Sequence, residues 1–113
     1  MSYLKDMSTL CLLISVSTEL PIFTGTIEVD TSNGPITIFM KSPPYHENPD
    51  NYLIIKKIST DNNIISLFSE SCFVNNCDII IFGLPPHAKV IHGKVSTLVL
   101  IPIGSNWKII REQ

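Results

Sequence analysis

The C-terminal end of the chain constrains the fold more than any other segment. Two apolar runs rich in β-branched residues flank the turn sequence Gly104-Ser105-Asn106, and the second run opens on Trp107, the only tryptophan. Strand-forming runs on either side of a short glycine-containing turn are typical of a β-hairpin. Isoleucine occurs eighteen times and alanine once, and this bias favours strands over helices along the chain.

Apolar, β-rich runs recur at the spacing that is typical of an antiparallel sandwich. We therefore predict an all-β fold, an antiparallel and jelly-roll-like β-sandwich. Two further turn sequences, Asn33-Gly34-Pro35 and Asp61-Asn62-Asn63, predict hairpins between the strands that flank them. The predicted strands are residues 9–16, 22–30, 35–40, 52–59, 63–68, 78–83, 88–92, 95–101 and 107–111.

The length of 113 residues suits one domain, in which residues 1–21 form an N-terminal strand or arm and residues 22–113 form the core. Hydrophobic residues make up 44% of the chain and charged residues 16%, which is apolar for a small domain that exists alone. We therefore predict a homo-oligomer. The net charge of -2, without a basic run, argues against nucleic acid as a partner.

The cysteines Cys11, Cys72 and Cys77 form an odd and sparse set, which favours free thiols and synthesis in a reducing cytoplasm. The apolar run at residues 10–16 follows only Lys5 and Asp6 and lacks a cleavage site of small residues. The run is also far shorter than the ~20 residues needed to cross a bilayer. It predicts a first strand rather than a signal peptide, and we expect no membrane insertion.

A candidate metal set is Cys72-x4-Cys77-x9-His87-x4-His92, which pairs cysteines and histidines as some zinc sites do. The spacing does not fit the common zinc finger, and a predicted strand separates the two pairs. No Gly-x-Ser-x-Gly or Cys-His signature frames a nucleophile, and the acidic residues are scattered through turns. We expect no catalytic residue, no metal and no cofactor, with zinc as the alternative.

Lys56 and Lys57 interrupt an apolar strand, and adjacent strand residues point to opposite faces. One of them must therefore point inward or toward a partner chain. The alternatives are an edge strand whose charge blocks aggregation and a salt bridge between subunits. Trp107 is predicted to lie in the core or at an interface, with a sugar-stacking surface as the alternative.

Seven short motifs follow one another along residues 24–110: Ile27-x-Val29, Gly34-Pro-Ile-Thr-Ile38, Tyr52-Leu-Ile-Ile-Lys-Lys-Ile58, Asn62-Asn-Ile-Ile65, Ile81-Phe-Gly83, Val95-Ser-Thr-Leu-Val99 and Gly104-Ser-Asn-Trp107. Their order resembles a segment common in bacteriophage tail fibres and large-virus virion proteins. That resemblance implies a fibre-head-like β-sandwich that forms homotrimers. The chain departs from the family's pattern at Ser69 to Asp78, which we expect to be an inserted loop.

The resemblance implies a non-enzymatic structural protein of the virion, either a minor capsid or a decoration protein. Its expected partners are further copies of itself and other virion proteins. The alternative is a host-attachment module that recognises a glycan or a surface protein. In that case the candidate contact residues are Tyr45, His46 and the loop that carries Cys72 and Cys77.

Overall fold

The computed structural model describes residues 11–20, 24–43, 52–74, 79–83 and 95–113, which form nine strands and no helix. The all-β prediction is therefore confirmed, and no helix of these residues could cross a membrane. The strands are β1 (Cys11–Ile14), β2 (Thr18–Glu19), β3 (Gly25–Val29), β4 (Ile36–Met40), β5 (Leu53–Lys57), β6 (Ile65–Ser69), β7 (Ile80–Phe82), β8 (Thr97–Ile103) and β9 (Asn106–Glu112).

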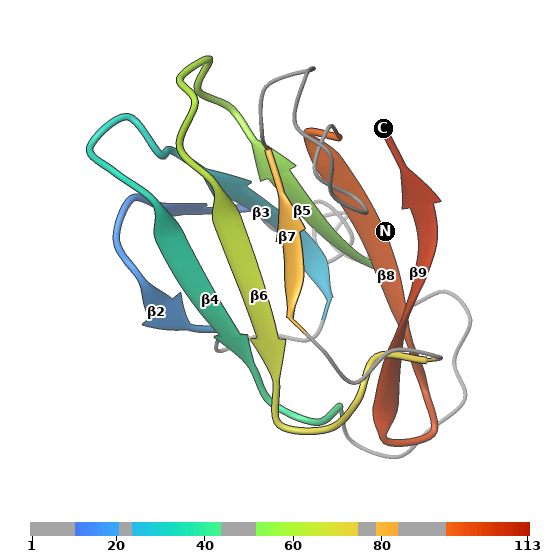
Figure 1. Ribbon diagram of the computed structural model, residues 1–113. Coiled ribbons are helices and arrows are strands. Elements are labelled where there is room, and N and C mark those ends of the chain that lie inside the picture. The colour runs from blue at the N-terminus through green and yellow to red at the C-terminus, as the bar shows by residue number, and fades with distance from the viewer. Residues whose placement is uncertain (1–10, 21–23, 44–51, 75–78, 84–94) are drawn as a thin grey trace, which may run out of the picture.

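The strands form two mixed sheets that face each other across one core (Figure 1). The five-stranded sheet has the order β1-β3-β5-β8-β9, and the four-stranded sheet has the order β2-β4-β6-β7. The pairs β1–β3, β3–β5, β2–β4 and β4–β6 are parallel, whereas β5–β8, β8–β9 and β6–β7 are antiparallel. The prediction of an antiparallel fold is thus wrong for the N-terminal half of the chain.

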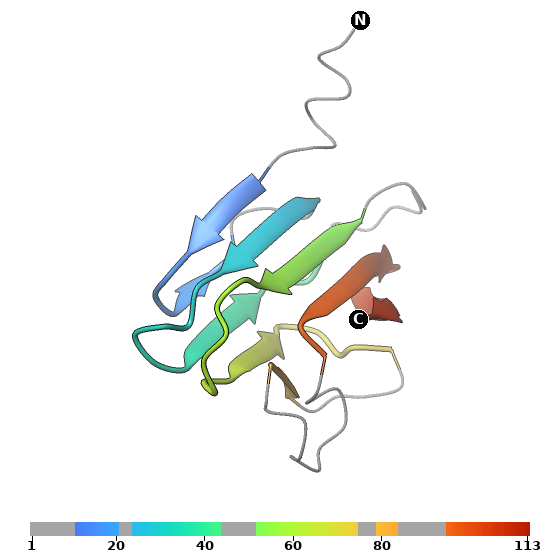
Figure 2. The same ribbon diagram turned by 90° about the horizontal axis from the view of Figure 1, so that it is seen from above.

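Successive strands from β1 to β6 alternate between the two sheets. Each pair β1–β2, β3–β4 and β5–β6 forms an arch, meaning two consecutive strands that lie in opposite sheets, and the three arches stack in parallel (Figure 2). The turn at Asn33-Gly34-Pro35 and the turn at Asp61-Asn62-Asn63 therefore cross between sheets. Both predicted hairpins are wrong, because a turn sequence marks a change of direction without specifying the layer that the chain enters next.

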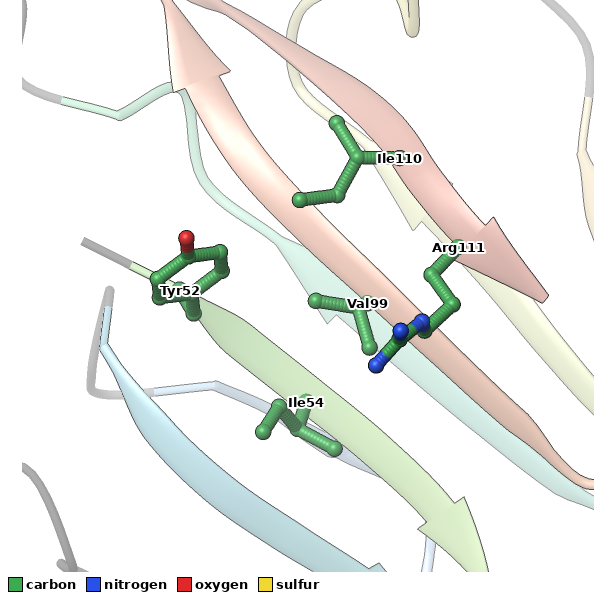
Figure 3. Close-up of a pocket in the computed structure, with 5 residues that line it drawn as sticks. All are labelled: Tyr52, Ile54, Val99, Ile110 and Arg111. Carbon is green, nitrogen blue, oxygen red and sulfur yellow. The ribbon is translucent and has the colours of Figure 1, made fainter. Parts of the chain in front are cut away.

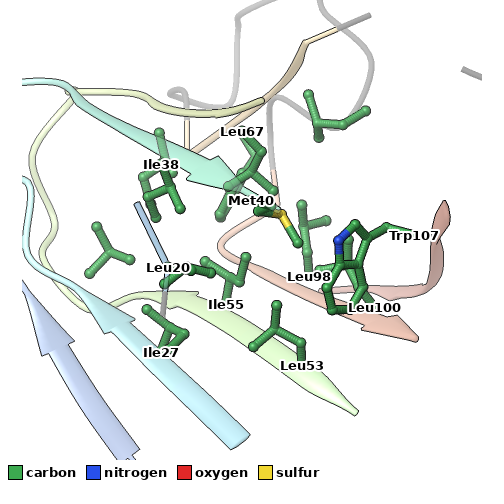
Figure 4. Packing of buried hydrophobic residues seen from close by; sticks show 14 of the residues in the cluster. Leu20, Ile27, Ile38, Met40, Leu53, Ile55, Leu67, Leu98, Leu100 and Trp107 are labelled. Atoms are coloured by element: carbon green, nitrogen blue, oxygen red, sulfur yellow. The ribbon is translucent and has the colours of Figure 1, made fainter. Parts of the chain in front are cut away.

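Among the described residues, seventeen buried apolar residues form the core between the sheets. Strand side chains alternate between the core and the outer surface, as in β4, where Ile36, Ile38 and Met40 are buried while Thr37 and Phe39 are exposed. Trp107, 1% exposed, packs at one end of this core, and its Nε1–H donates to the carbonyl of Lys41 at 3.0 Å (Figure 4). The core prediction for Trp107 is confirmed, and the sugar-stacking alternative is wrong.

The C-terminal hairpin is confirmed. Strands β8 and β9 pair antiparallel from Ile103 opposite Asn106, so the connection is the two residues Gly104 and Ser105. Gly104 has φ +61°, a left-handed conformation that glycine adopts without a steric cost. Strand β8 has the predicted length but begins and ends two residues later, because the alternation of buried and exposed residues continues through Pro102 and Ile103. Strand β9 extends one residue further at each end than predicted.

The remaining strand predictions differ from the structure mainly at their ends. The strand predicted at 88–92 lies outside the described residues. The prediction missed β2, a strand of only two polar residues with no apolar alternation to reveal it. Residues 11–20 of the predicted N-terminal arm give one strand to each sheet and place Ile14 and Leu20 in the core.

Candidate binding groove

A row of side chains crosses the outer face of the five-stranded sheet. Ile54 on β5 lies opposite Val99 on β8, and Val99 lies opposite Arg111 on β9. Their strand neighbours Leu53, Ile55, Leu98 and Leu100 are buried. Because strand side chains alternate, this row must face away from the core.

An irregularity in the β8–β9 ladder adds a fourth side chain to this face. Val99 pairs with Arg111 whereas its neighbour Leu100 pairs with Ile109, so Ile110 is an extra residue on β9. Such a bulge redirects the side chain of the extra residue. Ile110 is 42% exposed and lies beside Arg111, over the row.

Tyr52, the residue immediately before β5, is the fifth residue on this face. Its carbonyl accepts hydrogen bonds from Gly25 N–H at 2.9 Å and from the Thr24 hydroxyl at 3.1 Å, so its backbone is fixed to the neighbouring strand. The ring is 44% exposed. The five residues line a shallow groove of about 490 Å³, into which their side chains converge (Figure 3).

The chemistry of this groove suits the binding of an apolar group. Three aliphatic side chains provide an apolar floor, and Tyr52 and Arg111 provide a phenol and a guanidinium at its rim. The five lining residues include no carboxylate, imidazole or thiol, and Tyr52 provides the one hydroxyl among them. The groove can hold an apolar side chain while Arg111 pairs with a carboxylate or a carbonyl.

The lysine pair lies on the same strand but outside the groove. Lys56 is exposed, and Lys57 is 8% exposed, so the prediction that one of the two points inward is confirmed. The edge-strand interpretation is wrong, because β5 is the central strand of its sheet. The ion-pair partner of Lys57 belongs to the same chain: its Nζ lies 3.4 Å from Asp61 Oδ1.

Lys57 is held by three carbonyls. Its Nζ donates to the carbonyl oxygens of Asp61, Asn63 and Gly83 at 2.6, 2.7 and 2.9 Å. These contacts tie β5, the turn after it and the end of β7 together. A buried ammonium with this many partners has a structural role, since each partner offsets the desolvation of the charge.

Asp61 joins this cluster to the preceding arch. The Thr31 hydroxyl donates to Asp61 Oδ1 at 2.6 Å, and this bond, with further donors around it, holds the pKa of Asp61 well below its usual range. The side-chain amide of Asn63 donates through Nδ2 to the Thr31 carbonyl at 2.8 Å, and the backbone N–H of Thr31 donates to Ser59 Oγ at 2.9 Å. The turns of two stacked arches are thereby fastened together.

The other sequence candidates divide into two groups. Tyr45, His46, Cys77, His87 and His92 lie outside the described residues. Cys72 is half-buried and disulfide-bonded, while Cys11 is free, so the expectation of free thiols is wrong for Cys72. An odd number of cysteines leaves room for one bridge, and the count alone did not reveal it. Among the described residues, no group of three or more acidic, histidine or cysteine side chains could hold a metal ion.

Sequence reasoning missed the groove. Its residues come together through strand register and a bulge, neither of which the sequence specifies. One feature of the sequence could have indicated it: residues 52–55 and 98–101 are apolar at every position, so a strand formed by either segment has an apolar outer face as well as an apolar inner face. Comparisons of the chain with protein-family models, with curated proteins and with solved structures find no match.

Proposed function

We propose that this protein is a non-enzymatic structural component of a virus particle, a fibre-head-like β-sandwich that acts through contacts with other protein chains. The observation that supports contacts with other protein chains is the groove formed by Tyr52, Ile54, Val99, Ile110 and Arg111. The resemblance of the motif order to tail-fibre and virion proteins supports the assignment to a particle.

The composition of the groove fits a protein partner. Tyrosine and arginine are enriched among the residues that dominate the energy of protein interfaces, and apolar residues form the centres of such interfaces. The groove also lies on paired strands rather than on a loop, so binding requires little ordering of the chain. An apolar side chain of a partner would bury the exposed surfaces of Ile110 and Tyr52.

A glycan is a poorer fit to the same surface. Sugar hydroxyls need several hydrogen-bonding groups, and among the five lining residues only Tyr52 and Arg111 have polar side chains. Trp107, the aromatic residue first considered for sugar stacking, is buried. We therefore favour a protein neighbour in the particle over attachment to a host glycan.

The resembling motifs coincide with the elements that build the core. Ile27-x-Val29 lies in β3, the segment from Tyr52 to Ile58 contains β5, and the segment from Gly104 to Trp107 forms the last turn. The role in a particle is then inferred from the proteins in which the motif order is common.

The test uses particles of the virus that encodes the chain. Quantitative mass spectrometry of purified particles is expected to find the protein as a stoichiometric component. A chain with Val99→Lys and Ile110→Lys should fold with an unchanged melting temperature but fail to enter particles. Thr37→Lys, on the exposed face of the other sheet, is the matched control and should enter normally.

Absence of the protein from purified particles would refute the virion role. Full incorporation of the Val99→Lys and Ile110→Lys variant would refute the role of the groove.

A further inference from the structure

In the part of the chain that the structure describes, the stack of arches ends at strands β1 and β2. Strand β1 is an edge of the five-stranded sheet, and β2 is an edge of the four-stranded sheet at the same end of the stack (Figure 2). Within the described residues, β1 pairs only with β3. Among the described residues, no strand pairs with the other side of β1.

The backbone of β1 shows which groups these are. The Ile14 carbonyl accepts a hydrogen bond from Asp30 N–H at 2.9 Å, so the peptide groups of Ile14 face β3. In an extended strand the direction alternates, and the N–H and C=O groups of Leu12 also face β3. Those of Cys11 and Leu13 face outward from the sheet edge.

The two edges of the five-stranded sheet differ sharply in protection. The edge strand β9 carries three charged residues, Lys108, Arg111 and Glu112, and contains a bulge. Charges and bulges on an edge strand discourage its pairing with a further strand. Strand β1 consists of Cys11, Leu12, Leu13 and Ile14, with no charge, proline or bulge, and its Leu13 side chain is 63% exposed. An unprotected apolar edge of this kind is a site for strand addition.

We propose that β1 pairs antiparallel with β1 of a second copy of this chain, about a two-fold axis through Leu12. This deepens the proposed function, on which it rests, by naming the surface through which copies of the protein contact each other. The five-stranded sheets of two copies then join edge to edge into one continuous sheet.

The edge is complementary to itself in this register. Cys11 of each copy lies opposite Leu13 of the other, so the outward N–H and C=O groups of both residues are paired. Leu12, which packs partly buried against the core, lies opposite Leu12 of the second copy on the same inner face. Strand β1 contains no charged residue, so the pairing places no like charges opposite each other. The nearby Glu19 is already paired with Lys41 at 3.3 Å.

A two-fold axis also explains why the partner is the same chain. The edge offers only four residues, and an interface that uses the same residues twice doubles its area and its hydrogen bonds. The apolar composition of the chain, 44% hydrophobic against 16% charged, agrees with a surface that is covered by another copy. The pairing makes dimers, whereas the resemblance implies trimers.

Sedimentation equilibrium of the full-length isolated chain tests the pairing. The wild type should be a dimer at micromolar concentration, and Leu13→Lys should be a monomer with an unchanged fold by circular dichroism. Ile103→Lys is the control, since Ile103 is an apolar residue, 46% exposed, on β8 of the same sheet, outside the groove and distant from β1 in strand order, and this variant should remain dimeric.

Cross-linking tests the register. Under mild oxidation Leu13→Cys should form a covalent dimer, because the introduced thiol lies opposite Cys11 of the other copy at a separation that a disulfide can span. Adding Cys11→Ser should abolish that cross-link, and Ile103→Cys should form none.

A monomeric wild type, or a dimer or trimer that persists in Leu13→Lys, would overturn the proposal. A cross-link that survives Cys11→Ser would overturn the register. These measurements use the isolated chain, so their failure is distinguishable from a failure of the particle experiments.

Discussion

Trp107 is the residue whose removal should cost the most packing. Its ring is buried at one end of the core and its Nε1–H is bonded to Lys41. Trp107→Ala should lower the free energy of unfolding by about 3–5 kcal/mol, a large share of the ~5–15 kcal/mol typical of a small domain. Denaturant unfolding measures this loss. Trp107→Phe keeps most of the ring volume and should cost less; equal costs would mean that packing is not the main contribution.

Asp61 should make stability depend on pH. Its pKa in the folded chain is lowered from about 3.8, so the unfolded chain binds a proton more readily. The stabilisation is therefore fully present above the unfolded pKa and is lost as pH falls below about 4 toward the folded pKa. The stability difference between wild type and Asp61→Asn should shrink on acidification from about pH 6 to pH 3. A difference that stays constant would show that the charge of Asp61 contributes nothing.

At the scale of elements, the C-terminal hairpin was predictable and the arches were not. Gly104-Ser105 lies between two long apolar runs of adjacent sequence, and such runs pair with each other locally. The turn between β3 and β4 and the turn between β5 and β6 were recognised from the sequence. The strands that flank each turn do not pair with each other, because β3 pairs with β5 and β4 pairs with β6. Alternating burial identifies a strand and its inner face, but does not identify its neighbour. The groove depends on that pairing, so it was also unpredictable.

The buried lysine that links β5 to β7 restricts its neighbour Gly83. Gly83 has φ +84°, and a Cβ there would lie 2.9 Å from Lys57 Cδ, whose ammonium is fixed by three carbonyls. Gly34, at φ +140°, has no atom within 4 Å of its Cβ position and is the control. Gly83→Ala should cost about 1–3 kcal/mol more than Gly34→Ala, because of the added steric conflict. Denaturant unfolding compares the two, and a cost for Gly83→Ala no greater than that of the control would show that Lys57 moves freely.

For the molecule as a whole, pairing through β1 would couple folding to association. A dimer that forms only between folded chains stabilises the folded state by mass action, so its melting temperature rises with protein concentration. We therefore expect the melting temperature of the wild type to increase over a hundredfold concentration range, whereas that of Leu13→Lys stays constant. Ile103→Lys should behave as the wild type does. Calorimetry or circular dichroism provides the measurement. A wild-type melting temperature independent of concentration would mean that the end of the stack at β1 and β2 is stable without a partner, and that the apolar β1 edge is tolerated in a monomer.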